Sequence, residues 1–421
     1  MKKLLPTLLG LSVLFLAACT KDFGTVEVTY QKATAVYGDL EEQRDLPLLA
    51  EARPIENAGK VFVAPDMLLI GEEGTGIHIV DNSDPKNPVN LSFVQIPGNR
   101  EFYVDGITLY AESLYDMLKL DISDMNNPKL ISRVKDAFAD SQNFQDNDGN
   151  TLLKFDFEEV TEKVTEDSEI YQQLWGHQEV YYFDFASKII PPSQVPVSFA
   201  GNSSASVGSV NRIAVVDEYV YVISRDFITT FEDNGELTAK NTSYGFGNLE
   251  TIYPNGDRLF LGTAQSMEIY SIADPSNPEW QHSFSHATSC DPVLPCGEVA
   301  YVTLRTGDVG NCPGDVNALL VVDLSNTIPE ELQEIEMQSP YGMTVINNRL
   351  YVGEGSNGLK IFDISDKENI ELERWEREIE AYDIIYHPTE PNLLLVAGPV
   401  GISQYQIEGG VDYSLLSVLN F

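Results

Sequence analysis

Short runs of alternating apolar and polar residues recur along the chain, and turn-forming residues separate them. Each complete copy is an apolar run that ends in an acidic or polar residue, followed by a turn rich in Asp, Asn, Ser and Pro. Alternation with a period of two residues between such turns is typical of half-buried β-strands. The clearest copies are Ile77–Asp81, Met117–Asp121, Met267–Ser271, Leu319–Asp323 and Leu359–Asp363.

Strand-like segments also surround each run. A third strand follows the Pro-rich turn, as in Lys129–Val134 and Glu371–Arg377, and a further strand opens each set, as in Lys60–Ala64 and Gly342–Ile346. Between the opening strand and the run we expect a second strand. These second strands are expected at Met67–Gly71, Ile107–Glu112, Tyr219–Ser224, Arg258–Gly262, Val299–Leu304, Arg349–Gly353 and Asn392–Ala397.

The repeating unit is therefore four short strands, and a four-stranded repeat of roughly 40–45 residues is typical of a β-propeller blade. One such sheet cannot bury both of its faces alone, whereas blades stacked around an axis bury them against each other. We therefore expect an all-β fold, a β-propeller with four antiparallel strands per blade. Seven blades are expected at about 60–98, 99–138, 205–246, 247–287, 288–339, 340–380 and 381–421.

The expected propeller domain spans residues 60–421 and contains an insertion at about 139–204, which does not fit the period. Eight blades are the alternative, because Val180–Asp184 repeats the core pattern within this insertion. Otherwise Leu152–Phe157 and Tyr181–Phe185 could form a decorating hairpin. Residues 19–59 would hold a linker, and Thr25–Tyr30 is the candidate strand for closing the ring. The aspartates that end the runs, Asp81, Asp121, Asp323 and Asp363, are interpreted as turn caps rather than catalytic groups.

The first residues resemble an export signal. Lys2 and Lys3 precede a short apolar run, and Leu16-Ala17-Ala18-Cys19 follows before polarity rises. This arrangement resembles the lipobox of bacterial lipoproteins. The resemblance implies that residues 1–18 are a signal peptide and that Cys19 is the lipidation site and the mature N-terminus. An ordinary secretory signal with a chance cysteine is the alternative.

The repeat also resembles a known family. Ile77–Asp81, Leu319–Asp323 and Leu359–Asp363 are similar to the LVIVD repeat of lipid-anchored surface proteins from Bacteroidetes-type bacteria. The likeness covers most of residues 30–421 and implies a propeller-like fold. It also implies that the protein is exported and anchored by a lipid in the bacterial cell envelope. The outer membrane is the expected membrane, and exposure at the cell surface is the alternative within it. The likeness implies no particular reaction.

The net charge of the chain excludes some classes of binding partner. With 26 basic and 65 acidic residues the formal net charge is −39, which disfavours nucleic acid and electrostatic adsorption to anionic lipid. No apolar run of about 18–20 residues is present in the sequence, so membrane association would come through the lipid at Cys19. The expected ligand is a protein or a glycan, and the oligomeric state is left open.

Three further cysteines, Cys290, Cys296 and Cys312, lie in one short stretch, so at most one disulfide can form among them. Cys290 with Cys312 is the preferred pair because it would join the two ends of a long hairpin. Cys296 is the alternative partner.

The sequence motifs predict no catalytic, cofactor-binding or metal site. His-Glu-x-x-His, Gly-x-Ser-x-Gly and Walker motifs are missing from the sequence. His282 and His286 would lie roughly 13 Å apart in a strand, too far to share one ion. The loop Asp146–Asn150 lacks the glutamate that completes a calcium loop. Aromatic residues that could pack between blades or line a ligand-binding face are Tyr110, Tyr115, Trp175, Tyr341 and Tyr382.

Two functions remain. The first is a non-enzymatic binding or scaffold module, because propeller loops display varied side chains on a rigid body. The second is a hydrolase or lyase that acts on an extracellular polymer through carboxylates in the central channel. Two or three inward carboxylates with a His or Arg at the channel mouth would favour the enzyme, and small or apolar groups would favour binding.

Overall fold

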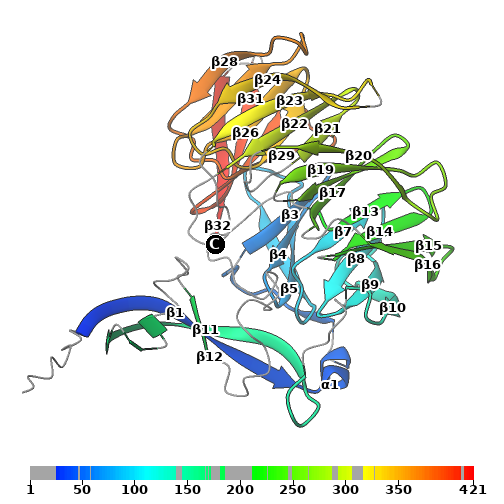
Figure 1. The fold of residues 1–421 in the computed structure, drawn as a ribbon, viewed down its shortest axis with the longest axis vertical. Coiled ribbons are helices and arrows are strands. Elements are labelled where there is room, and N and C mark those ends of the chain that lie inside the picture. Colours follow the sequence, from blue (N-terminus) through cyan, green and yellow to red (C-terminus); the bar gives the residue numbers. More distant parts are fainter. Residues whose placement is uncertain are drawn as a thin grey trace, which may run out of the picture.

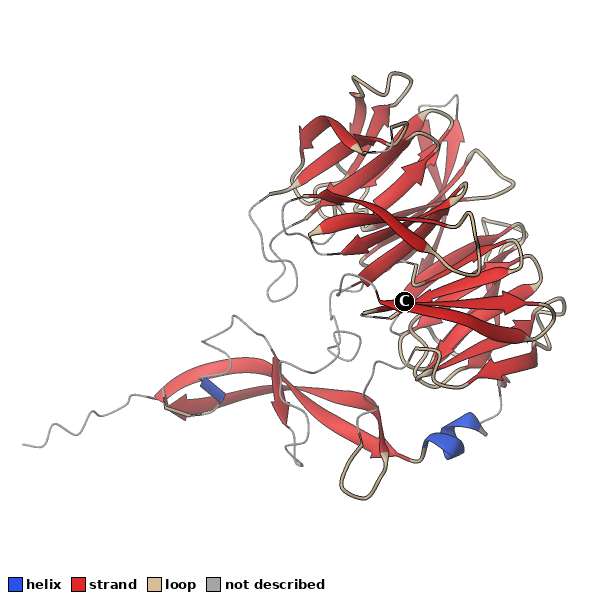
Figure 2. Ribbon diagram, turned by 45° about the vertical axis from the view of Figure 1, so that its right-hand side comes forward, coloured by secondary structure: helices blue, strands red, loops and turns tan. Residues whose placement is uncertain are grey.

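The computed structural model describes most of the chain after residue 24, and its secondary structure is almost entirely β-strand (Figures 1 and 2). The all-β prediction is therefore confirmed. The described residues include a short helix, α1 (Leu40–Arg44), and no helix within them is long and apolar enough to cross a membrane. The described residues are 25–45, 48–56, 58–138, 145–165, 167–168, 170–171, 181–184, 211–224, 226–244, 249–263, 265–286, 293–305, 316–326, 328–408 and 412–421.

Most described strands form four-stranded antiparallel sheets, each built from four consecutive strands paired in chain order. Three of these sheets are β7 (Phe102–Asp105), β8 (Thr108–Ser113), β9 (Asp116–Asp121) and β10 (Lys129–Val134); β13 (Ile213–Val216), β14 (Tyr219–Ile223), β15 (Phe227–Asp233) and β16 (Leu237–Tyr244); and β17 (Leu249–Asn255), β18 (Arg258–Thr263), β19 (Ser266–Ser271) and β20 (Glu279–Ser285). Three more are β21 (Val293–Cys296), β22 (Val299–Leu304), β23 (Ala318–Asp323) and β24 (Glu330–Glu336); β25 (Met343–Ile346), β26 (Arg349–Gly353), β27 (Leu359–Asp363) and β28 (Glu371–Glu376); and β29 (Asp383–Tyr386), β30 (Leu393–Gly398), β31 (Gly401–Glu408) and β32 (Asp412–Asn420).

One sheet of this kind carries a fifth strand. It contains β3 (Ala58–Ala64), β4 (Met67–Glu72), β5 (Gly76–Asp81) and β6 (Val89–Gln95), and β2 (Leu49–Glu51) extends it beside β6. The alternation of apolar and polar residues predicted the bounds of many of these strands correctly. The predicted strands Lys129–Val134, Val299–Leu304 and Arg349–Gly353 coincide with β10, β22 and β26.

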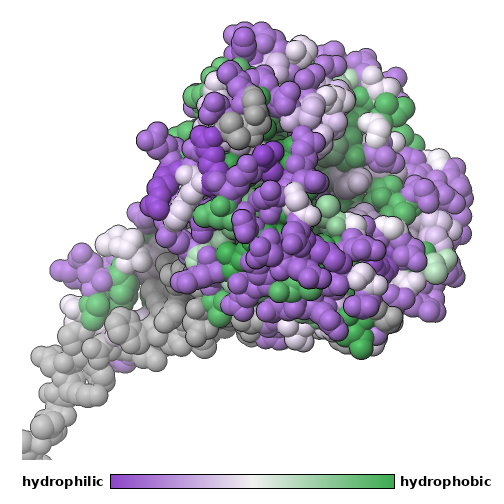
Figure 3. All heavy atoms as spheres, turned by 90° about the horizontal axis from the view of Figure 1, so that it is seen from above, coloured by the Kyte–Doolittle hydropathy of each residue, from purple (hydrophilic) through white to green (hydrophobic). Residues whose placement is uncertain are grey.

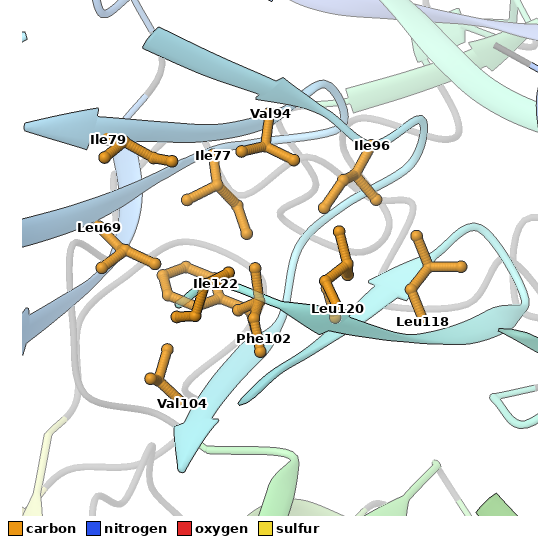
Figure 4. Close-up of a cluster of buried hydrophobic side chains, with 12 residues drawn as sticks. Leu69, Ile77, Ile79, Val94, Ile96, Phe102, Val104, Leu118, Leu120 and Ile122 are labelled. Atoms are coloured by element: carbon orange, nitrogen blue, oxygen red, sulfur yellow. The ribbon is translucent and has the colours of Figure 1, made fainter. Parts of the chain in front are cut away.

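The first strands of these sheets lie around a common axis. Strands β3, β7, β13, β17, β21, β25 and β29 each contact the next, and β29 contacts β3 again. Neighbouring sheets are joined by apolar side chains from facing surfaces. Figure 4 shows Leu69, Ile77 and Val94 of one sheet packed toward Phe102 and Leu120 of the next. Burial between sheets is what a single four-stranded sheet could not achieve alone.

The ring closes by packing rather than by strand exchange. Val61 and Leu68 of the first sheet share a buried cluster with Leu395 and Ile402 of the last, and Phe421 packs against it. The last sheet takes all four strands from the end of the chain. The prediction that Thr25–Tyr30 closes the ring is wrong.

That segment instead lies in β1 (Thr25–Gly38), the central strand of a separate three-stranded sheet. It pairs antiparallel with β11 (Thr151–Thr165) and parallel with β12 (Tyr181–Asp184). The prediction of a hairpin between Leu152–Phe157 and Tyr181–Phe185 is therefore wrong, because β1 lies between the two strands. Figure 1 shows this long, twisted sheet apart from the other sheets.

The two ends of the ring differ. Since neighbouring strands are antiparallel, the turns after the first and third strands of each sheet lie on one side, here called the turn face. Connections after the second and fourth strands lie on the other side, here called the loop face. Aspartates cap the turns as predicted. The Oδ1 atoms of Asp81, Asp121, Asp323 and Asp363 accept hydrogen bonds from the backbone N–H groups of Ser83, Ser123, Ser325 and Ser365.

Candidate functional site

The loop face carries the longest connection between two ring sheets, residues 135–212 between β10 and β13. Here the connections meet the starts of the inner strands, so polar residues from several sheets come together near the axis. Functional groups on propeller-like bodies are expected on such loops, held in place by rigid strands. Three groups of side chains stand out: an ionic cluster, an aromatic cluster and a buried histidine.

The ionic cluster is centred on Lys60 of β3. Its ammonium contacts the Glu101 carboxylate and lies 2.6 Å from Oδ1 of Asn211. Lys60 and Glu101 are 7% and 4% exposed, so both charges are removed from water. Burial raises the pKa of Glu101, and Lys60 counteracts this shift. The contacts join three consecutive sheets, since Glu101 precedes β7 and Asn211 precedes β13.

Two arginines extend this cluster. Nη1 of Arg212 lies 3.9 Å from Oε2 of Glu112, and Nε of Arg100 lies 3.9 Å from Oε1 of Glu73. These distances exceed hydrogen-bonding distance, so both pairs are electrostatic contacts only. Burial raises the pKa of Glu112, and the two guanidinium groups oppose that shift. The cluster combines carboxylates with arginines, which is the combination expected above for an enzyme. Its carboxylates Glu101 and Glu112 are buried, however, rather than exposed to a substrate.

The aromatic cluster lies farther round the ring. The rings of Tyr341 and Tyr382 meet edge to face at 4.8 Å, and the Arg305 guanidinium lies 4.2 Å from the Tyr341 ring. Gly355 makes this packing possible. It has a φ of +55°, and an added Cβ would lie 2.7 Å from the Tyr341 ring. Tyr341 and Tyr382, two of the predicted aromatic candidates, are thus brought together at the starts of β25 and β29.

The buried histidine was not predicted by the sequence. His78 of β5 is 0% exposed, and its Nε2 lies 2.5 Å from Oε2 of Glu72. Burial lowers the pKa of His78, and Glu72 opposes this. Arg53 also bonds Glu72, at 2.7 Å, and its guanidinium lies 3.9 Å from the Phe93 ring. This group fastens the segment after β2 to the first sheet. An enclosed imidazole of this kind has no access to a substrate.

Other predicted aromatic candidates pack within the fold. Tyr110 is buried, and its hydroxyl donates to Oδ2 of Asp233 at 2.5 Å. Tyr115 is also buried, and its hydroxyl donates to the Leu152 carbonyl at 2.9 Å. Both therefore serve packing between elements, as the sequence also allowed. Trp175 lies outside the described residues.

Most of the predicted modification sites also fall outside the described residues. These are Cys19, Cys290 and Cys312. Cys296 is described, and it is an exposed free thiol at the end of β21. The pairing of Cys290 with Cys312 stays a prediction.

Metal ligands do not cluster in the described part of the chain, where no group of three or more His, Cys, Asp or Glu residues could hold an ion. His282 lies in β20, and His286 follows that strand. In the loop Asp146–Asn150 the Asp146 carboxylate accepts hydrogen bonds from the backbone of Asp148 and from the backbone and side chain of Asn150. The Asp146 side chain therefore caps the turn of its own loop.

Comparison with known proteins supports the repeat. Residues 342–373, which span β25 to β27 and the start of β28, match the family model of the LVIVD repeat. The chain contains an LVIVD repeat. The predicted resemblance is therefore confirmed, and the matched segment includes Leu359–Asp363. No curated protein sequence matches the chain.

Solved structures share the fold at low sequence identity. A protein from Lactobacillus plantarum is 12% identical with a TM-score of 0.50, and the match covers 86% of this chain and 98% of that one. A chain of the mitotic checkpoint complex is 8% identical with a TM-score of 0.50, covering 83% and 91%. BamB from Moraxella catarrhalis is 9% identical with a TM-score of 0.47, covering 81% of each chain. The structural neighbours of this LVIVD-repeat chain are β-propeller proteins.

Proposed function

We propose that this protein is a lipid-anchored binding or scaffold protein of the bacterial cell envelope, built on a seven-bladed propeller whose loop face recognises a ligand. Seven blades are favoured over eight because the strands β1, β11 and β12 form a sheet of different topology. That sheet joins segments from distant parts of the chain, and β1 pairs with β12 in parallel. The remaining sheets all contain four antiparallel strands in chain order.

The observation that carries the binding role is the contrast between the two faces. The turn face repeats one short Asp-capped turn, with the same N–H to carboxylate bond in four sheets. The loop face instead carries connections of different length and chemistry, with an ionic cluster in one part and Tyr341 and Tyr382 in another. Varied groups on a rigid, repeated support are what specific recognition requires.

The anchor is proposed from the sequence alone. Acylation of Cys19 would hold the chain at a membrane, since each buried CH₂ contributes roughly 0.8 kcal/mol. The net charge of −39 would keep the body away from anionic headgroups. Cys19→Ser should therefore release the protein into the soluble fraction and abolish incorporation of labelled fatty acid. Continued incorporation would place the lipid elsewhere.

The expected ligand is a protein or a glycan rather than a nucleic acid. Acidic residues outnumber basic ones by 65 to 26, and several basic groups near the axis already contact carboxylates. Figure 3 shows one face of the molecule with hydrophilic residues over most of it and small, separate hydrophobic patches. No large apolar interface is therefore expected on this face.

The binding role can be tested with the anchor-free chain in a screen of glycans and cell-surface proteins. Tyr341→Ala with Tyr382→Ala should abolish capture of the ligand. The matched control is Ile107→Ser, which removes a 63% exposed apolar side chain from a turn-face connection. Ligand capture that is unaffected by the tyrosine pair but lost in the control would move recognition to the other face.

Two observations favour the enzymatic alternative. Glu101 and Glu112 lie inward beside Arg100 and Arg212, and burial raises the pKa of Glu250 to about 7. A carboxyl group with such a pKa suits general acid–base chemistry near neutral pH. Hydrolase assays on extracellular polysaccharides should therefore accompany the screen. Turnover that is abolished by Glu250→Gln or Glu112→Gln would replace the binding proposal.

A further inference from the structure

A cavity of about 290 Å³ opens between the sheets β7–β10 and β13–β16. One wall is formed by Val134 to Ala137, at and after the end of β10, and the other by Ser224 and residues of β15 and β16. Its volume is just below the range of about 300–1,000 Å³ that is usual for ligand pockets. It therefore has room for one ring-sized group rather than for a peptide helix or a whole acyl chain.

The wall on β15 and β16 alternates aromatic and hydroxyl-bearing pairs. Cross-strand register places Phe227 opposite Tyr244, Thr229 opposite Thr242, and Phe231 opposite Ala239. Directly opposed residues of an antiparallel pair project from the same face of the sheet. The cavity is thus bordered by two hydroxyl groups, Oγ1 of Thr229 and Oγ1 of Thr242, which lie 3.4 Å apart.

Tyr244 lies beside the cavity rather than in its lining, opposite the lining residue Phe227. Its ring lies 4.8 Å from that of Phe227, yet the residue is 80% exposed. It is the most exposed of the large hydrophobic side chains identified in the described chain. A tyrosine combines a flat apolar ring with a polar tip, so its exposed ring face can stack against a partner.

Lys135 and Asp136 are the charged residues among the described ones that line the cavity. Nζ of Lys135 lies 2.9 Å from Oε1 of Glu41, and both side chains are exposed to solvent. Asp136 adds a carboxylate that can accept hydrogen bonds but repels anions. The net charge of −39 disfavours an acidic ligand. The hydroxyl groups among the apolar residues disfavour a purely apolar one.

We infer that this cavity binds one sugar ring of a neutral glycan. A pyranose has an apolar C–H face, which would lie against Tyr244 and Phe227. It also has a rim of hydroxyl groups, which would bond the threonine hydroxyls and the Asp136 carboxylate. This inference rests on the proposed binding role and adds a second ligand site, separate from the Tyr341 and Tyr382 cluster.

The test uses the chain without its lipid and a panel of neutral oligosaccharides: maltohexaose, cellohexaose, xylohexaose, laminarihexaose and mannohexaose. Trigalacturonate serves as the acidic probe and laurate as the apolar probe. Binding is measured by calorimetry, and contact with the cavity by saturation transfer from protein to ligand protons. At least one neutral oligosaccharide should bind. Tyr244→Ala should weaken it roughly tenfold, as expected for the loss of one aromatic stacking contact.

Thr229→Val with Thr242→Val keeps the side-chain shape and removes both hydroxyl groups, so it should also weaken binding. The control is Tyr386→Ala, which removes a 39% exposed tyrosine from the last sheet and should leave affinity unchanged. The inference is wrong if no neutral oligosaccharide binds, if Tyr244→Ala has no effect, or if only trigalacturonate or laurate binds. Capture of a protein through Tyr341 and Tyr382 without any glycan binding would keep the proposed function and reject this inference alone.

Discussion

Asn82 and Gln404 exchange two hydrogen bonds although 322 residues separate them in the sequence. Nδ2 of Asn82 donates to Oε1 of Gln404 at 3.0 Å, and Nε2 of Gln404 donates to Oδ1 of Asn82 at 2.7 Å. Asn82 follows β5 in the first sheet, and Gln404 lies in β31 of the last. The two amides are 1% and 0% exposed. They therefore form a specific polar contact at the closure of the ring, within otherwise apolar packing.

Replacing one amide should destabilise the fold more than replacing both. Gln404→Met leaves the Asn82 amide buried without its partner, which should cost about 1–3 kcal/mol of unfolding free energy. Adding Asn82→Leu removes the orphaned group, so the double variant should lose less than the sum of the single variants. Urea unfolding measures both values. Asn241→Ala, at an exposed amide pair with Asn277, is the control and should change stability by under about 0.5 kcal/mol. Strict additivity would contradict the coupling.

Local patterns predicted the ring sheets well, for a physical reason. Each strand pairs with its neighbour in the chain, so alternation and turn residues contain most of the information needed. The turn aspartates Asp81 and Asp363 are examples, since each bonds a backbone group two residues away. The same local signal fails for β1. The alternation in β1 predicts a strand but does not determine which strand it pairs with. In the structure Tyr30 lies opposite Val160, a residue far away in the sequence.

The candidate site was harder to predict than the fold. Tyr341 and Tyr382 could be named as loop aromatics, but their contact depends on the placement of two separate sheets. The ionic cluster gives no local signal, because Lys60, Glu101 and Asn211 meet only when three sheets are arranged around the axis. The strongly acidic composition also conceals the few carboxylates that are buried.

The Lys60–Glu101 pair should be essential as a pair rather than as individual charges. Lys60→Met leaves a buried carboxylate without its cation, which should cost about 3–5 kcal/mol of unfolding free energy. The combined change Lys60→Met and Glu101→Leu removes both charges and should recover much of that loss. Chemical denaturation of the single and double variants provides the comparison. A double variant that is less stable than Lys60→Met would show that Glu101 is stabilised by partners other than Lys60, such as Arg212.

Asp116 should hold α1 and the end of the three-stranded sheet against the ring. Its 0% exposed carboxylate accepts bonds from Arg44 at 2.6 and 2.7 Å and from Arg133 at 3.0 Å. Although burial alone would raise the pKa of Asp116, these partners lower it. Asp116→Ala should leave both guanidinium groups without their carboxylate and increase proteolytic cleavage around residues 40–48. The control Asp156→Ala changes an exposed carboxylate on β11 and should leave cleavage unchanged. Equal protection of both variants would contradict this role.

The contacts of the Asp116 carboxylate should also make the attachment of α1 depend on pH. Because the folded-state pKa of Asp116 is lowered, its stabilising effect is present above the unfolded-state pKa of about 3.9 and is lost as pH falls through the lower folded value. Cleavage around residues 40–48 should therefore rise only in strong acid, tested with an acid-active protease. The Asp116→Ala variant should lack this transition. A transition retained in the variant would assign it to another group.

Glu250 should have the opposite pH dependence. It occupies the β-bulge between Leu249 and Thr251, and burial raises its pKa from 4.5 to about 7. The folded state therefore favours the protonated carboxyl, and stability is lost as pH rises from the unfolded-state pKa through the folded one. Glu250→Gln removes this loss, so it should stabilise the protein by up to about 3 kcal/mol at pH 8 and by little at pH 4. Thermal unfolding between pH 4 and 9 measures the difference, with Glu236→Gln as a control at an exposed carboxylate. A stabilisation that is equal at both ends of this range would mean that Glu250 is ionised normally in the folded protein.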